Sequence, residues 1–353
     1  MKTTHKSQCS LLKIGKVSFT IIGTIIGAGF ASGKEVATFL GVYGNFAYIA
    51  SLIFCCLFCV GTIYFSNMDK SLISPTLNTA INISIFTSEF ISIVAMMAGL
   101  NAIFDMLFTS QIPYHISLVL IFLIIITGFN GLTSTNLILV PILIISIIIF
   151  GVIGATTSPN YKLITTNCSP IFTVTSLPLY IGMNLFSIFP IAIEFSSYQT
   201  KKERTISAII SSVLLYLLVL SFCFTILNAN YDVCMSELPL IIFIIDVAPT
   251  FILLTIITLA IAIITTIISD GFVVHTLLKK KIKKGTNILL LFILIVAYFI
   301  SKLGFSNIVE KFYPITGFIG AVLTLILVIK GITTKFNQPK TFLKKRLLKS
   351  PFN

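Results

Sequence analysis

The sequence predicts an all-α integral membrane protein of about ten transmembrane helices, built as a 5+5 inverted repeat with broken helices 1 and 6. Three observations predict this class. The chain of 353 residues is 56% hydrophobic and only 10% charged, with a mean hydropathy of +1.06, which is far from the composition of soluble domains. Apolar stretches of membrane-spanning length recur along it. Glycine and proline interrupt the first and the sixth of these stretches.

The apolar stretches divide the chain into two sets of five. An odd number of spans in each half gives the two halves opposite orientations, so structural repeats would be inverted. We expect an N-terminal segment at 1–12, a first repeat at 13–155, an external connector at 156–172, a second repeat at 173–332 and a basic tail at 333–353. The predicted spans are 13–40, 43–66, 81–109, 116–129, 136–155, 173–198, 205–228, 250–279, 286–303 and 312–332.

The basic residues predict the orientation. Of the 24 Lys and Arg residues, all but four fall on the side of the N-terminus, the exceptions being Lys34, Lys162, Lys302 and Lys311. Because cytoplasmic loops carry the excess of positive charge, we expect both termini on the cytoplasmic side of the membrane. The net charge of +13 does not indicate nucleic acid, since the lysines cluster between apolar spans. We expect anionic headgroups to bind the tail residues Lys344, Lys345, Arg346 and Lys349.

The first span holds a run of glycines where a membrane helix is normally continuous. Residues 23–35 read GTIIGAGFASGKE, and each glycine weakens a helix by about 1 kcal/mol. Non-helical backbone is tolerated at membrane depth only where it is buried in protein or lines a cavity. A break here exposes amides and carbonyls that can hold a solute or an ion.

The sixth span is interrupted at a corresponding position. Residues 178–194 read PLYIGMNLFSIFPIAIE, in which Pro178, Gly182 and Pro190 flank the polar Asn184 and Ser187. Interrupted helices at matching positions of two halves indicate a transporter binding site. The alternative is that each proline or glycine is an ordinary kink or packing residue.

The eighth span supplies neutral oxygen atoms. Ala262, Thr265 and Thr266 stand at i, i+3 and i+4 and share one helix face. Hard cations prefer oxygen ligands, and carbonyls at Gly23 and Ile26 in the broken first span would complete a shell around Na⁺. Alternatively, the threonines bond back to their own i−4 carbonyls.

The segment GTIIGAGFASGKE resembles the YkvI-type family of bacterial membrane proteins. That family belongs to the amino acid–polyamine–organocation superfamily, with the inverted-repeat fold of the neurotransmitter:sodium symporters. The resemblance implies that carbonyls at Gly23, Ile26 and Ala262 and hydroxyls of Thr265 and Thr266 bind sodium. The superfamily also has proton-driven members, some of which lack the hydroxyl pair.

A solute is expected between the two breaks. The expected solute-binding residues of span one are Gly27, Ala28, Gly29 and Phe30, because free amides here begin the second half of the span and a helix N-terminus suits a carboxylate. The superfamily resemblance implies amino acids or related amines as substrates. The expected lining groups of span six are Tyr180, Gly182, Asn184 and Ser187.

Carboxyl groups inside a membrane are functional candidates. Glu35 either pairs locally with Lys34, caps the outer vestibule or binds a substrate amine. Glu194 and Asp270 stand near cytoplasmic lysines and form either salt bridges or a gate, whereas Glu89 has no partner by sequence and is the best proton-relay candidate.

These features together predict a secondary transporter that works by alternating access around helices 1 and 6, with Na⁺ as the coupling ion. The alternatives are a proton-coupled transporter of the same fold and a germinant-receptor-like sensor that binds without transport. We expect no enzyme activity, because the three histidines form no cluster by sequence, and no cofactor besides Na⁺. The segment GAGFASG does not match the dinucleotide fingerprint, and the sequence gives no indication of oligomeric state.

Overall fold

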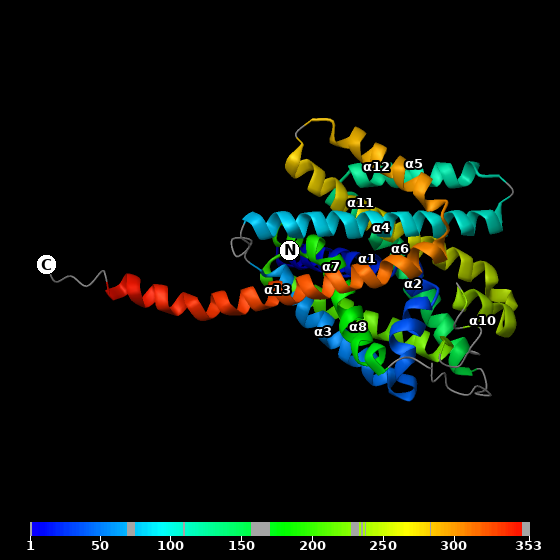
Figure 1. Cartoon of the computed structure of the whole chain (residues 1–353), viewed down its shortest axis with the longest axis horizontal. Helices are drawn as coiled ribbons and strands as arrows, with labels where there is room; N and C mark the ends of the chain where they lie inside the picture. Colours follow the sequence, from blue (N-terminus) through cyan, green and yellow to red (C-terminus); the bar gives the residue numbers. More distant parts are fainter. Residues whose placement is uncertain are drawn as a thin grey trace.

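The computed structural model describes residues 2–68, 75–108, 110–156, 170–226, 233, 236, 238–282 and 284–347, and their regular structure is entirely helical (Figure 1). Within these ranges, seven helices are long and apolar enough to cross a membrane, and α5 (Ile112–Ile126) and α12 (Thr286–Ser301) are shorter apolar helices. The broken first span, α1 (Lys2–Ile25) with α2 (Ala28–Ala31), completes the expected order. The all-α membrane fold is therefore confirmed.

The remaining helices follow the predicted spans. In the first half they are the π-helix η1 (Val36–Leu40), the 3₁₀ helix η2 (Gly41–Phe46), α3 (Ala47–Ser66), α4 (Pro75–Leu107) and α6 (Phe129–Thr156). In the second half they are α7 (Pro170–Tyr198), α8 (Lys201–Ile226), α10 (Pro239–Val247), η4 (Pro249–Phe251), α11 (Ile252–Lys281) and α13 (Phe305–Leu347).

Both predicted end segments are helical in the described residues. Helix α1 begins at Lys2, within the segment predicted to precede the first span, and α13 runs past 332 to Leu347. Residues 157–169 of the predicted connector and the side chains of the basic tail lie outside the described part of the chain.

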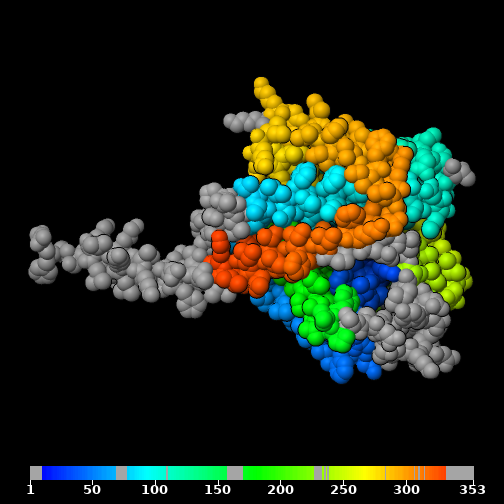
Figure 2. Space-filling model, in the orientation of Figure 1, coloured from blue at the N-terminus to red at the C-terminus, as the bar shows by residue number. Residues whose placement is uncertain are grey.

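The contacts between helices are consistent with an inverted repeat. If α1, α3, α4, α5 and α6 correspond to α7, α8, α11, α12 and α13, each contact in one half should recur in the other. Helix α1 packs on α6, and its counterpart α7 packs on α13. Helix α1 also packs on α8, and α7 packs on α3 in the same way. Likewise α4 contacts α12 as α11 contacts α5, and α4 contacts α13 as α11 contacts α6. Helices α4 and α13 lie side by side on the face shown in Figure 2.

The first span breaks where the glycines predict it. Between α1 and α2 the backbone at Gly27 is extended, with φ −92° and ψ −167°. After α2 the chain turns at Gly33, whose φ of +80° is a left-handed conformation that favours glycine. Beyond this turn, the Glu35 side chain lies next to Gly29.

The sixth span is not broken, contrary to the prediction. Helix α7 runs without interruption from Pro170 to Tyr198 and contains both Pro178 and Pro190. Each proline removes one amide donor, and α7 packs along both α3 and α13, which offsets the lost hydrogen bonds. Gly182 contacts α13 at Ala321 so closely that a side chain would overlap the Ala321 backbone. The glycine of this span therefore serves helix packing.

Basic residues gather at one end of the bundle, called here the lysine-rich end. Lys13 lies 5.6 Å from the ring centre of Tyr198, Lys16 donates a hydrogen bond to Ser134, and Lys280 stands at the end of α11. At the opposite end, Lys34 Nζ donates to Ser236 O and Lys302 lies over the ring of Tyr298. This segregation matches the asymmetry read from the sequence.

Candidate functional site

Five oxygen atoms predicted to bind a cation gather where α11 passes the break in the first span. Thr266 Oγ1 lies 3.3 Å from Ile26 O, 3.4 Å from Gly23 O and 3.0 Å from Ala262 O. Thr265 Oγ1 lies 3.0 Å from the same Ala262 O. We call these five atoms the oxygen cluster. All five residues that supply them are buried.

The chemistry of the oxygen cluster suits a small monovalent cation. The Thr266 hydroxyl has one hydrogen but lies within hydrogen-bonding distance of three carbonyl oxygens, so it cannot satisfy them all. Both threonine hydroxyls also lie within hydrogen-bonding distance of their own i−4 carbonyl oxygens, as the alternative predicted. Thr266 Oγ1 additionally contacts Gly23 O of α1. Every ligand would be uncharged, which fits Na⁺ better than Ca²⁺, whose sites are rich in carboxylates.

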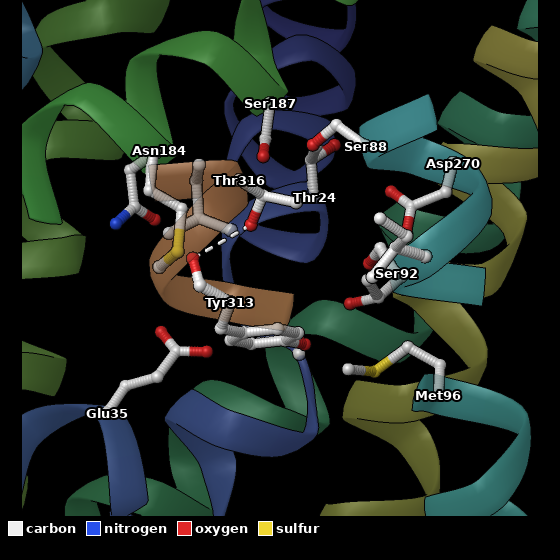
Figure 3. Close-up of a pocket in the computed structure, with 15 residues that line it drawn as sticks. Thr24, Glu35, Ser88, Ser92, Met96, Asn184, Ser187, Asp270, Tyr313 and Thr316 are labelled. Carbon is white, nitrogen blue, oxygen red and sulfur yellow. Dashed lines mark hydrogen bonds between the residues drawn. The ribbon is translucent and has the colours of Figure 1, made fainter. Parts of the chain in front are cut away.

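A cavity of about 50 Å³ adjoins the oxygen cluster, because Thr266 belongs to both and Gly27, next to Ile26, also lines the cavity. Its lining comes from the first span, α4, α7, α11 and α13 (Figure 3). Hydroxyls dominate the polar lining: Thr24, Ser88, Ser92, Ser187, Thr266, Tyr313 and Thr316. Among the described residues that line it are the carboxyls of Glu35 and Asp270 but no lysine, arginine or histidine. Such a cavity favours a cationic or hydrogen-bonding solute.

Glu35 lies on one side of this cavity and Asp270 on the other, with Tyr313 between them (Figure 3). The Glu35 side chain is buried, and its Oε1 and Cγ contact the backbone of Gly29. It makes no ion pair or hydrogen bond with another side chain in the described ranges. Of the roles expected for Glu35, pairing with Lys34 is not the one the structure shows.

Glu89 and Asp270 face each other across the contact between α4 and α11. Both are 2% exposed, and their carboxyl groups lie within hydrogen-bonding range of one another. Glu89 Oε1 and Asp270 Oδ2 accept no hydrogen bond from a donor in the described protein. Two carboxylates this close repel each other unless one of them is protonated or a cation lies nearby. The sequence expectation was wrong in two respects: Glu89 has a partner, and Asp270 faces Glu89 instead of a lysine.

Three of the residues predicted to bind solute, Gly27, Asn184 and Ser187, line the cavity. Asn184 also donates from Nδ2 to Tyr180 O within α7. Gly29 is separated from the cavity by Glu35, which occupies the place where a substrate carboxylate was expected.

Other predicted residues lie behind the cavity in the protein core. The Ala28 amide donates to Met96 Sδ, and the Phe30 ring packs edge-on against Phe222 with centroids 5.3 Å apart. Tyr180 is fully buried and stacks on Phe54 at 4.5 Å. Gly182 lies against α13, and Glu194 is half-buried in α7 beyond the cavity lining. Phe30, Tyr180 and Gly182 pack against apolar residues. Helical spacing in the sequence did not distinguish such core positions from positions that line the cavity.

The cavity also contains residues that sequence reasoning missed. Ser88 and Ser92 stand one turn apart on α4 around Glu89, and that spacing was a signal in the sequence. Tyr313 and Thr316 come from α13, and no local pattern marked them as lining groups.

A second cavity of about 410 Å³ lies nearer the lysine-rich end. It is lined by α4 from Asn78 to Ile85, α7 from Phe189 to Ile193 and α11 from Phe272 to Lys280. These three helices also line the central cavity.

Comparison with known proteins agrees with this architecture. The chain is 23% identical over 336 residues to the uncharacterized membrane protein YkvI of Bacillus subtilis (strain 168), covering 87% of this chain and 94% of that protein. It is 24% identical over 334 residues to the uncharacterized protein YyaD of the same organism, covering 90% and 96%. The expected resemblance to YkvI-type proteins is confirmed. No family model matches the chain.

A solved structure shares the fold. Mhp1, a nucleobase-cation-symport-1 family transporter in a closed conformation with bromovinylhydantoin bound, matches with a TM-score of 0.57 and 13% identity. The match covers 89% of this chain and 76% of Mhp1. At this identity the likeness shows the fold alone.

Proposed function

We propose that this protein is a secondary transporter of a small organic solute, coupled to Na⁺ and embedded in a bacterial plasma membrane with both termini in the cytoplasm. The observation that carries the proposal is the oxygen cluster, in which Gly23 O of α1 and Ile26 O of the break meet Thr266 Oγ1 of α11. An ion bound there would bridge the broken helix to α11 and so bias the conformation of the break. The shared fold with Mhp1, which is a symporter by its family, supports this function.

The solute is an amino acid or a related amine. Glu35 and Asp270 are acidic groups of the central cavity, and its described lining contains no basic residue, so a carboxyl there can pair with a protonated amine, whereas a free anion finds no cationic partner in that lining. At about 50 Å³ the cavity is smaller than such a solute, and binding requires the lining helices to separate. The second cavity, which opens toward the lysine-rich end, is the route by which the solute reaches that side.

Proton coupling is the second candidate, and the Glu89–Asp270 pair favours it. Two buried carboxyls that face each other favour sharing a proton, and Asp270 lines the central cavity. A cation arriving in the cavity would stabilise the ionised form of the pair and release such a proton. The pair stands on α4 and α11, which pack against each other.

Thermal unfolding of the purified protein tests these alternatives. An amino-acid and amine panel is screened in Na⁺ and in choline at two pH values, because a ligand that binds the folded state raises its stability. A solute shift that requires Na⁺ supports the symporter. A shift that depends on pH but not on Na⁺ supports proton coupling instead. Binding without uptake into liposomes under either gradient contradicts transport and supports the sensor.

A further inference from the structure

Asn136 in α6 is a buried polar residue without a role in the helix packing or the cavity lining described so far. Its side chain is 0% exposed, and neither Oδ1 nor Nδ2 has a hydrogen-bond partner in the described part of the protein. An amide buried without partners is unfavourable, and a position that needed only packing would be served better by leucine. Both polar atoms of the Asn136 amide therefore lack a protein partner within the described residues, and a bound ion could serve as one.

Asn136 lies against Gly23, a residue of the oxygen cluster. A Cβ atom at Gly23 would lie 2.7 Å from Asn136 Oδ1 and 3.0 Å from Asn136 Cγ, so only glycine allows α1 to approach α6 this closely. The carbonyl oxygen of the same Gly23 lies 3.4 Å from Thr266 Oγ1. The Asn136 amide and the Thr266 hydroxyl therefore both adjoin Gly23.

We propose that Asn136 Oδ1 is a further ligand of the cation held by the oxygen cluster, supplied by α6. Asparagine carbonyls are established ligands of hard cations, and a sixth neutral oxygen adds coordination without adding charge. The site therefore keeps its preference for a monovalent ion. The bound ion joins α6 to α1 and α11, so a third helix responds to ion binding. This inference rests on the proposed Na⁺ binding.

The test compares variants of the full-length protein by thermal unfolding in increasing NaCl, with choline chloride keeping the ionic strength constant. Asn136→Leu removes the amide at similar volume and is expected to need about tenfold more Na⁺ for half of the stabilisation. The same variant should melt at a higher temperature in choline, because an unpartnered amide is gone. Asn136→Asp keeps an oxygen ligand and should need no more Na⁺ than the wild type. The matched control is Thr133→Val, one turn away on α6, whose hydroxyl bonds Asn130 O.

The outcomes distinguish failure of the Asn136 ligand role from failure of the proposed Na⁺ binding. If Asn136→Leu responds to Na⁺ like the wild type while the wild type is clearly stabilised, the inference is overturned and the Na⁺ site stands. If the wild type itself is indifferent to Na⁺, the proposed coupling ion is wrong and the inference is overturned with it. If Asn136→Leu does not fold, Asn136→Asp decides: loss of the Na⁺ response in that variant overturns the ligand role, and retention supports it.

Discussion

Thr266 and Ile26 meet at the centre of the bundle, where the threonine hydroxyl lies 3.3 Å from the isoleucine carbonyl oxygen. The contact joins a continuous helix of the second half to the break in the first helix. It exists because Ile26 and Gly27 leave the helix between α1 and α2, and because glycine at 27 allows Thr266 Oγ1 to approach. The coupling proposed above depends on this contact.

Removing both hydroxyls of the oxygen cluster should abolish the response to Na⁺. We expect Thr265→Ala with Thr266→Ala to lose Na⁺-dependent stabilisation and Na⁺-dependent solute uptake, because two of the five ligands are lost. The matched control is Thr255→Ala with Thr258→Ala, two buried threonines of α11 that bond only their own i−4 carbonyls. Normal Na⁺ dependence in the first variant would refute the site.

Glu35 should determine affinity for the amine of the solute. We expect Glu35→Gln to weaken amine binding about 10- to 100-fold, as removal of a charged hydrogen-bonding partner typically does. Isothermal titration with the amine found in the panel measures this. Glu194→Gln changes a half-buried carboxyl outside the cavity lining and serves as the control. Equal losses in both variants would contradict a direct role for Glu35.

Gly182 should be required for stability and not for solute contact. We expect Gly182→Ala to lower stability by about 1–3 kcal/mol, because the new methyl group overlaps the α13 backbone at Ala321. Gly317→Ala is the matched control, since its nearest atom in space would be 3.9 Å away. Equal melting temperatures for the two variants would show that α7 and α13 are not packed this closely.

The Glu89–Asp270 pair should carry any dependence of uptake on pH. Glu89→Gln keeps a hydrogen-bond donor toward Asp270 but removes the shared proton, so we expect normal folding and uptake that no longer varies with pH. Asp105→Asn alters an exposed carboxyl of the same helix and should leave the pH profile unchanged. Persistence of the wild-type profile in Glu89→Gln would exclude the pair from coupling.

Sequence patterns within one segment were sufficient to predict the break in the first span and the oxygen-bearing face of α11. The break at Gly27 was predictable because glycine density weakens a membrane helix wherever it occurs, and the oxygen face of α11 was predictable from helical spacing. The break in the sixth span was not, because Pro178 and Pro190 bend or break a helix according to what packs around it.

The sequence by itself determined the membrane class, the order of the spans and the residues of the oxygen cluster, because hydropathy and helical period act within one segment. Only the tertiary structure decided that Glu89 faces Asp270, that Glu35 covers Gly29 and that Asn136 borders Gly23. These contacts join helices that are distant along the chain. Which face of one helix meets another is set by packing of side chains across the whole bundle, and no single segment contains that information.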